Sequence, residues 1–441
     1  MNLSETPVES STAAAHKAAA FVVRWQLLWV ALLSPLFLFP PLGRPVLLLI
    51  LLLVVVWVIA LIRRLDPLPL TPLNGALALM TVMVLVSLWA TFDIEFSAAK
   101  VLGVILGIAV FFGVVAAIRG GFRTDIALDL FIAAGTALAI VGLLGTNWIG
   151  KVPVVEKITA RLPAVIRGVP GQAEGFQPNA VAGALVMFIP LQLAFVVASR
   201  ANTTLLRRLL HVIALLIIGG TLLLTQSRSG WIALAVGLGA WAIWNSRRSR
   251  FALLGVVLVA AVVLATSWTR LEPLLSRAAG SGIREDTAGR MELWSRAIYG
   301  IEDFPITGMG MNAFRKVMPV FYPTFLSSPD TDIAHAHNHL LQAALDLGLP
   351  GLIAYLALWF GAAGLLTITI HRSTDPDQRR IVSGLAAGMI AYFVFGTADT
   401  IALGAKVGIF FWIALALIVA VYDSTRGGDG AHHRGTEITE V

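Results

Sequence analysis

Long apolar segments recur along almost the whole chain, and they restrict what it can fold into. Runs of about 17–22 apolar residues are each long enough to cross a bilayer core of roughly 30 Å as a helix. Hydrophobic residues make up 58% of the sequence and charged residues only 13%, and the mean hydropathy is +0.84, far from the averages of soluble proteins. The runs show no period-2 alternation, which argues against an outer-membrane barrel. The sequence predicts an all-α, polytopic membrane protein.

Apolar runs bounded by charged residues predict about twelve transmembrane helices. They are expected at 26–42, 45–62, 72–91, 101–118, 127–145, 179–198, 209–225, 230–245, 251–267, 350–370, 381–397 and 407–422. A tail at 1–25 precedes nine of these helices, which span 26–267 and enclose a loop at 146–178. A large loop at 268–338 carrying short helices follows, then a short loop helix and three spans over 339–422, and a polar tail at 423–441.

The placement of Lys and Arg in the short connections predicts the orientation. One set of connections holds thirteen arginines, whereas the alternate set holds only Arg44, Lys100, Arg228 and Lys406. Because cytoplasmic loops carry the excess of Lys and Arg, we expect the richer set and both tails in the cytoplasm. The two long loops then lie on the outer face. The net charge of +7 matters for this placement and does not indicate a nucleic-acid partner.

Three of the eight histidines lie within five residues, in the segment AHAHNHLLQAALDLGLPG that begins at residue 334. Asn338 is a good N-cap, HLLQAALDL resembles a short helix, and Gly348 fits the C′ position that ends it. Residues two apart on a helix point about 200° away from each other, so His337 and His339 cannot both face one substrate if the segment is helical. An extended segment would put His335, His337 and His339 on one face.

Three interpretations of this cluster stay open. One histidine can act as a general base, which we favour because imidazole titrates near neutral pH. The cluster can instead be structural, through capping or packing. A zinc site would need a further ligand, and no nearby carboxylate completes the set. Cysteine is absent, so no Cys-based metal site exists.

Three arginines are candidates for binding phosphate oxygens: Arg228 in TQSRSGWIAL, Arg167 in VIRGVPGQAEGFQPN and Arg290 in TAGRMELW. A guanidinium fork binds phosphate bidentately and keeps its charge at any relevant pH. Each arginine can equally be a snorkelling anchor at a membrane boundary. Together with a histidine on the outer face, they favour a lipid-linked phosphate or pyrophosphate as ligand.

These residues resemble the motifs of the O-antigen ligase and O-antigen polymerase superfamily of membrane glycosyltransferases, most closely the ligases. The ligase pattern of His-Asn, nine residues, Gly, two residues and Gly is filled by His337-Asn338, Gly348 and Gly351. Further motifs of the family match the following residues: Ser227-Arg228-Ser229-Gly230-Trp231, Arg167-Gly168 with Pro178-Asn179-Ala180, and Pro305 with Gly308, Gly310 and Phe314. The resemblance covers roughly 165–360, and His335 and His339 are not part of it.

The resemblance implies a bacterial inner-membrane enzyme of lipopolysaccharide biosynthesis that uses no metal or other cofactor. It implies a glycan donor linked to undecaprenyl pyrophosphate, and lipid A-core or another glycan as acceptor. His337 would be the catalytic base, and the binding residues would be Arg228, Arg290, Arg167, Asn338 and Asn179. The alternatives are a polysaccharide polymerase of the same superfamily, a transporter of a small solute such as bicarbonate, and a non-catalytic glycan-binding scaffold.

Overall fold

The computed structural model describes residues 68–148, 153–162, 165–168, 175–198, 204–245, 288–326 and 332–435, with a few isolated positions near residues 60 and 250. Within these ranges the protein is all-helical, and its only β-type pairing is the isolated bridge between Thr146 and Phe176. The helices are α4 (Asn74–Ala90), α5 (Ile94–Arg119), α6 (Thr124–Gly145), α7 (Pro153–Thr159), α8 (Pro178–Leu185), α9 (Phe188–Val197), α10 (Leu205–Leu224), α11 (Arg228–Asn245), a helix at 288–303, α13 (Phe314–Phe321), α14 (His339–Arg372), α15 (Pro376–Ala398), the 3₁₀ helix η1 (Lys406–Gly408) and α16 (Ile409–Gly435).

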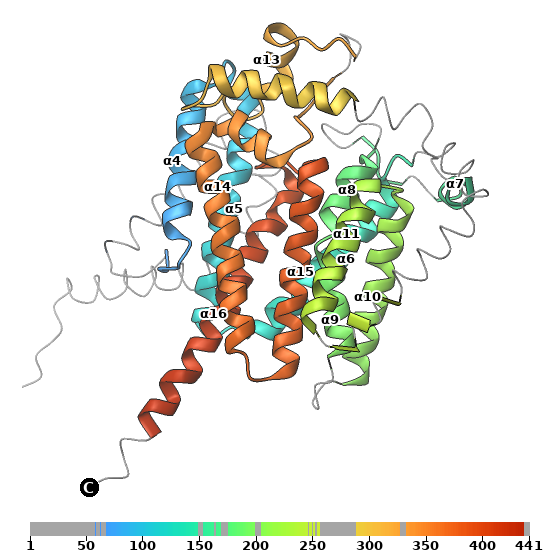
Figure 1. The fold of residues 1–441 in the computed structure, drawn as a ribbon, viewed down its shortest axis with the longest axis vertical. Helices are drawn as coiled ribbons and strands as arrows, with labels where there is room; N and C mark the ends of the chain where they lie inside the picture. Colours follow the sequence, from blue (N-terminus) through green and yellow to red (C-terminus); the bar gives the residue numbers. More distant parts are fainter. Residues whose placement is uncertain are drawn as a thin grey trace, which may run out of the picture.

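Helix α15 stands between two groups of helices (Figure 1). It packs against α9 and α11 on one side and against α14 on the other, while α5 pairs with α16, α4 with α14, and α10 with α6 and α9. The helix at 288–303, gold in Figure 1, lies across one end of these helices. We call this end, where α14 begins and α15 ends, the site end.

Every predicted span within the described residues corresponds to a helix, but the predicted count of twelve is not confirmed. In the part of the chain that the structure describes, six helices are long and apolar enough to cross a membrane, or up to seven if α8 and α9 form one span. The predicted spans at 26–42, 45–62 and 251–267 lie almost wholly outside the described residues. The chain is a helical membrane protein, and the periplasmic placement of its loops remains a prediction.

Two predicted boundaries were wrong for local reasons. The span expected at 179–198 is the bent pair α8 and α9, with a 40° angle between them. Pro190 explains the bend, because a proline ring clashes with the carbonyl four residues earlier, here Val186, and cannot donate to it. Helix α5 begins at Ile94 rather than near residue 101, since the Asp93 side chain caps it by accepting from the Phe96 N–H at 3.1 Å.

The break in α14 positions the large loop. Gly348 has φ 70° and ψ 179°, which interrupts the helix as the sequence predicts. Around it the Met309 N–H donates to the Leu345 carbonyl and the Leu349 N–H to the Pro305 carbonyl, both at 2.7 Å. A Cβ at residue 348 would lie 2.2 Å from the Ile306 oxygen, so only glycine fits there. The Pro305–Gly308 motif and the Gly348 motif therefore pack against each other through their backbones.

Basic residues are distributed toward both ends of the helices. Lys100, Arg228 and Lys406, from the sparser set of connections, lie near the beginnings of α5, α11 and α16 at the site end. At the opposite end Arg119 bonds to Asp423 at 2.8 Å and to the Leu70 carbonyl at 2.9 Å. The alternation used to predict the orientation is thus present in the fold, and the assignment of the opposite end to the cytoplasm remains a prediction.

Candidate functional site

Asn338 fixes the start of α14 at the site end. Its side-chain oxygen accepts from the Leu340 and Leu341 N–H groups at 2.9 and 3.2 Å, which confirms the predicted N-cap. Its amide nitrogen donates to the Thr397 carbonyl on α15 at 3.2 Å. Asn338 therefore joins the histidine segment to the end of α15, and its polar atoms are used within the protein.

The three clustered histidines have different surroundings. His339, the first residue of α14, is buried; its Nδ1 lies 2.9 Å from the Tyr355 hydroxyl, and its ring packs against Trp359 and Phe393. A Cβ on Gly396 would lie 2.7 Å from this ring. The structural interpretation thus fits His339 alone.

His335 and His337 lie together in the non-helical segment before Asn338. Their ring centroids are 4.4 Å apart, and the His337 N–H donates to His335 Nδ1 at 3.3 Å. His337 has a φ of 51°, which is uncommon for residues other than glycine, although Asn, Asp and His adopt it more often than most. The turn at His337 directs its ring toward the end of α15.

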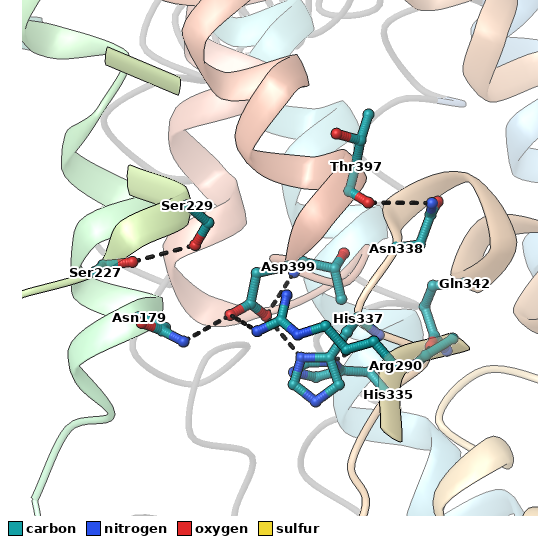
Figure 2. Close-up of polar contacts among 12 residues, drawn as sticks. Asn179, Ser227, Ser229, Arg290, His335, His337, Asn338, Gln342, Thr397 and Asp399 are labelled. Atoms are coloured by element: carbon teal, nitrogen blue, oxygen red, sulfur yellow. Dashed lines mark hydrogen bonds and ion pairs between the residues drawn. The ribbon is translucent and has the colours of Figure 1, made fainter. Parts of the chain in front are cut away.

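The carboxylate of Asp399 is the centre of the site (Figure 2). Its Oδ1 lies 3.1 Å from His337 Nδ1 and accepts from the Thr400 N–H at 2.8 Å. Its Oδ2 accepts from the Asn179 amide of α8 at 3.0 Å and lies 4.0 Å from an Arg290 guanidinium nitrogen. Asp399 thus connects α8, the helix at 288–303 and the histidine segment.

The electrostatics keep Asp399 charged and His335 neutral. Burial raises the pKa of Asp399, but the hydrogen bond and charge of His337, with His335 and the Thr400 N–H, lower this pKa further, so the net shift is downward. Burial and the neighbouring His337 lower the pKa of His335 from 6.5 to about 4. At neutral pH the site therefore combines a carboxylate with an uncharged imidazole beside His337.

The ligand types of His335, His337 and Asp399 also match an open metal site, and their ligand atoms lie within 4.8 Å of one another. The structure thus supplies the carboxylate that the sequence did not reveal. Both Asp399 oxygens already accept hydrogen bonds, however, and Arg290 adds a positive charge that opposes a cation. The arrangement better suits a His–Asp pair that moves a proton.

Arg228 and Arg167 also lie at the site end. Arg228 is exposed at the start of α11, between Ser227 and Ser229, whose hydroxyls lie 3.2 Å apart. A Cβ on Gly230, two residues on, would lie 3.0 Å from Ala182 of α8, and Figure 2 shows both serines on the Asn179 side of the site.

Arg167 is exposed in a segment held by the end of α6, where the Val165 and Ile166 N–H groups donate to the Leu144 carbonyl. Within the described residues it makes no hydrogen bond or ion pair with His337, Asp399 or Arg290. The structure thus brings together His337, Asn338, Asn179 and Arg290, but not Arg167.

Asp399 is the residue that sequence reasoning missed. It stands in FGTADTIAL, directly after the predicted span at 381–397. A lone carboxylate at the end of an apolar helix was the available signal, since such groups in membrane proteins commonly mark functional sites.

Residues 213–356 match the family model described as O-antigen ligase. This segment of the chain is similar to O-antigen ligases. This supports the superfamily predicted from the motifs and a membrane glycosyltransferase of the O-antigen ligase or polymerase type. The matched segment includes Arg228, Arg290, His337 and Asn338, whereas Asn179 and Asp399 lie outside it. No curated protein matches the chain.

Proposed function

We propose that the protein is an O-antigen ligase-like glycosyltransferase that moves a glycan from undecaprenyl pyrophosphate to an acceptor hydroxyl. The observation that supports this most is the His337–Asp399 pair, with Nδ1 and Oδ1 3.1 Å apart and Arg290 beside it. A base next to a guanidinium group suits attack by a hydroxyl on a sugar that carries a phosphate leaving group. The site end would face the periplasm of a bacterial inner membrane, with both termini in the cytoplasm.

In this mechanism Asp399 accepts a hydrogen bond from the Nδ1–H of His337, which keeps the proton on Nδ1 and leaves Nε2 free to take a proton. The acceptor oxygen loses its proton to Nε2 while it bonds to the anomeric carbon of the donor. The bond between that carbon and the phosphate oxygen breaks, and undecaprenyl pyrophosphate leaves with the electron pair. Because attack and departure occur on opposite faces, the anomeric configuration inverts. Asp399 also stabilises the resulting imidazolium.

Arginines would neutralise the charge that develops on the leaving group. Arg290 is the first candidate, because a guanidinium nitrogen lies 4.0 Å from Asp399 and its side chain is 20% exposed. Arg228 would act from α11, and Arg167 from the more distant segment near α6. With guanidinium groups in this role, the reaction needs neither metal nor nucleotide. Asn179 and Asn338 would hold Asp399 and the histidine segment rather than contact the glycan.

The test is transfer by the purified protein in a lipid bilayer, supplied with a lipid-linked glycan donor. His337→Ala is expected to lower kcat by roughly 10²–10⁴-fold, the usual contribution of a general base. His371→Ala is the matched control, because His371 is exposed near the far end of α14. Turnover of His337→Ala within a few-fold of the wild type would overturn the role of His337, and a retained anomeric configuration would overturn the direct displacement.

A polymerase of the same superfamily would use the same chemistry with a second lipid-linked glycan as acceptor. Offering lipid A-core and a lipid-linked repeat in separate reactions distinguishes the two activities. A solute flux that survives His337→Ala, without any glycan transfer, would favour a transporter. Donor binding without transfer in the wild type would favour a glycan-binding scaffold.

A further inference from the structure

A buried chain of hydrogen bonds reaches the catalytic segment from the side opposite Asp399. The Ala336 N–H, between His335 and His337, donates to Gln342 Oε1 at 2.9 Å. Gln342 Nε2 donates to Asp346 Oδ1 at 2.9 Å, and the same oxygen accepts from the Asn312 N–H at 3.2 Å. Ala336, Gln342 and Asp346 are each at most 3% exposed. Water therefore cannot replace a bond that is lost here without cost.

The direction of these hydrogen bonds is fixed by the backbone N–H groups at both ends. The Ala336 N–H can only donate, so the Gln342 side chain turns its Oε1 toward Ala336. Its Nε2 then faces Asp346 Oδ1, which also accepts from the Asn312 N–H. The Asn312 amide donates in turn to the Phe96 carbonyl at 3.1 Å, which extends the chain to α5. The hydrogen bonds thus run from α5 through Asn312, Asp346 and Gln342 to Ala336, the residue that precedes His337.

These hydrogen bonds hold the backbone next to His337, which has an uncommon conformation. His337 has φ 51°, and residues in such conformations cost roughly 1–3 kcal/mol and persist only where the surroundings hold them. Asn338 holds the turn on one side through Thr397, and Gln342 holds it on the other through Ala336. Without Gln342, the Ala336 N–H would be buried and unpaired.

We propose that Gln342, oriented by Asp346, is a positioning residue that holds the His337 turn in the shape required for proton transfer. This inference rests on the proposed function only for its kinetic consequence. Gln342 touches neither donor nor acceptor in this scheme, so its loss should lower kcat and leave the KM for the donor nearly unchanged. A displacement of about 1 Å in a catalytic group can cost roughly 100-fold in rate, and this is the loss expected for Gln342→Met.

The decisive experiment is a double-mutant cycle. Gln342→Met removes both bonds of the Gln342 amide, and Asp346→Leu removes the oxygen that accepts from Gln342 Nε2 and from the Asn312 N–H. If Asp346 acts through Gln342, the double variant Gln342→Met/Asp346→Leu should lose about as much kcat as Gln342→Met alone, well short of the product of the two single losses. Asp346→Asn is the matched control, because its amide oxygen can take the place of Oδ1 and accept both hydrogen bonds, so its kcat should stay within a few-fold of the wild type.

A second measurement does not depend on transfer. Hydrogen exchange of the peptide containing Ala336 should show about one additional fast-exchanging amide in Gln342→Met and in the double variant, and none in Asp346→Asn. Gln192→Met is the matched control: Gln192 is equally buried, but it donates to the His211 carbonyl, away from the site. In this control, exchange at Ala336 and kcat should be those of the wild type.

The two proposals fail in different ways. If the wild type transfers no glycan, but exchange at Ala336 is accelerated in Gln342→Met, the proposed function is wrong. The positioning role of Gln342 is then still supported. Unchanged exchange at Ala336 in Gln342→Met would overturn the positioning role, as would a double variant no better than the product of the single losses. A purely structural role would lower the melting temperature of Gln342→Met without separating kcat from KM, and that result also counts against the proposal.

Discussion

His337 Nδ1 lies 3.1 Å from Asp399 Oδ1, although the two residues are 62 positions apart in the chain. The carboxylate is buried at the end of α15, while the imidazole comes from the turn before α14. Such a pair fixes which imidazole nitrogen carries the proton. If the pair acts as proposed, the carboxylate should matter for catalysis nearly as much as the base.

Asp399→Asn should lower kcat by roughly 10²–10⁴-fold with little change in donor binding. The amide that replaces Oδ1 or Oδ2 can donate to His337 Nδ1, which places the imidazole proton on Nε2 and removes the base. Asp423→Asn is the control, because Asp423 pairs with Arg119 at the opposite end. Transfer assays with both variants check this, and equal activity of the two would exclude the tautomer role.

Arg290→Lys should weaken transfer because lysine cannot supply the bidentate fork to pyrophosphate oxygens. We expect a fall in kcat/KM of about tenfold or more, since one charge-assisted bond contributes on the order of 1.5–3 kcal/mol. Arg123→Lys serves as control, because Arg123 is exposed and pairs with Asp125 at 2.7 Å far from the site. Initial rates over a range of donor concentrations measure the effect, and unchanged kcat/KM for Arg290→Lys would remove Arg290 from the proposed phosphate site.

Acidification should destabilise the fold through His335. Its pKa is lowered to about 4 by burial and by His337, with smaller effects of Lys100 and Arg290 and an opposing effect of Asp399. The unfolded chain takes up this proton near pH 6.5, so between about pH 6.5 and 4 it binds more protons than the folded protein does. Stability therefore falls as the pH falls through this window.

His335→Asn should reduce the change of the free energy of unfolding with pH by at most roughly 1.4 kcal/mol per pH unit. Melting temperatures of the detergent-solubilised protein across the window test this, with exposed His371→Asn as the control. If the melting temperatures of His335→Asn and the wild type fall in parallel with pH, the His335 imidazole is not buried in its neutral form.

Gly348→Ala should destabilise the protein by about 1–3 kcal/mol from its backbone conformation alone, because φ 70° with ψ 179° is a region that essentially only glycine occupies, with a further cost from the Ile306 carbonyl. The matched control is Gly364→Ala on the same helix, where nothing lies within 4 Å of the new Cβ. That change should stabilise the helix by up to about 1 kcal/mol. Thermal unfolding of both variants measures the difference, and the prediction fails if Gly348→Ala is as stable as Gly364→Ala.

Local sequence signals predicted the helical architecture and part of the site. Apolar runs located the helices, and the cap at Asn338 and the break at Gly348 followed from the conformational preferences of those residues. The bend between α8 and α9 had a local signal in Pro190 that hydropathy overlooked. His337 was predicted through a family motif, since spacing alone could not separate three neighbouring histidines.

Tertiary packing determined the rest. His339 is structural because the first turn of α14 points it at Gly396, a contact between two helices that no periodicity shows. The partnership of Asp399 with His337 and Asn179 depends on how α8, α14 and α15 meet, over sequence separations of 62 and 220 residues. The substrate-binding role predicted for Asn179 stays a prediction, and the structure adds that its amide donates to Asp399.

The backbone bonds around Gly348 have a consequence for how the proposed site could accommodate a different acceptor. They tie the segment after the 288–303 helix to α14, so the segments that bear Arg290 and His337 form one connected wall of the site. The facing wall, formed by the beginnings of α8 and α11, is joined to it through the side chain of Asn179. Room for a bulkier glycan would therefore be gained by remodelling the α8 and α11 side, with the proton-transfer geometry left intact.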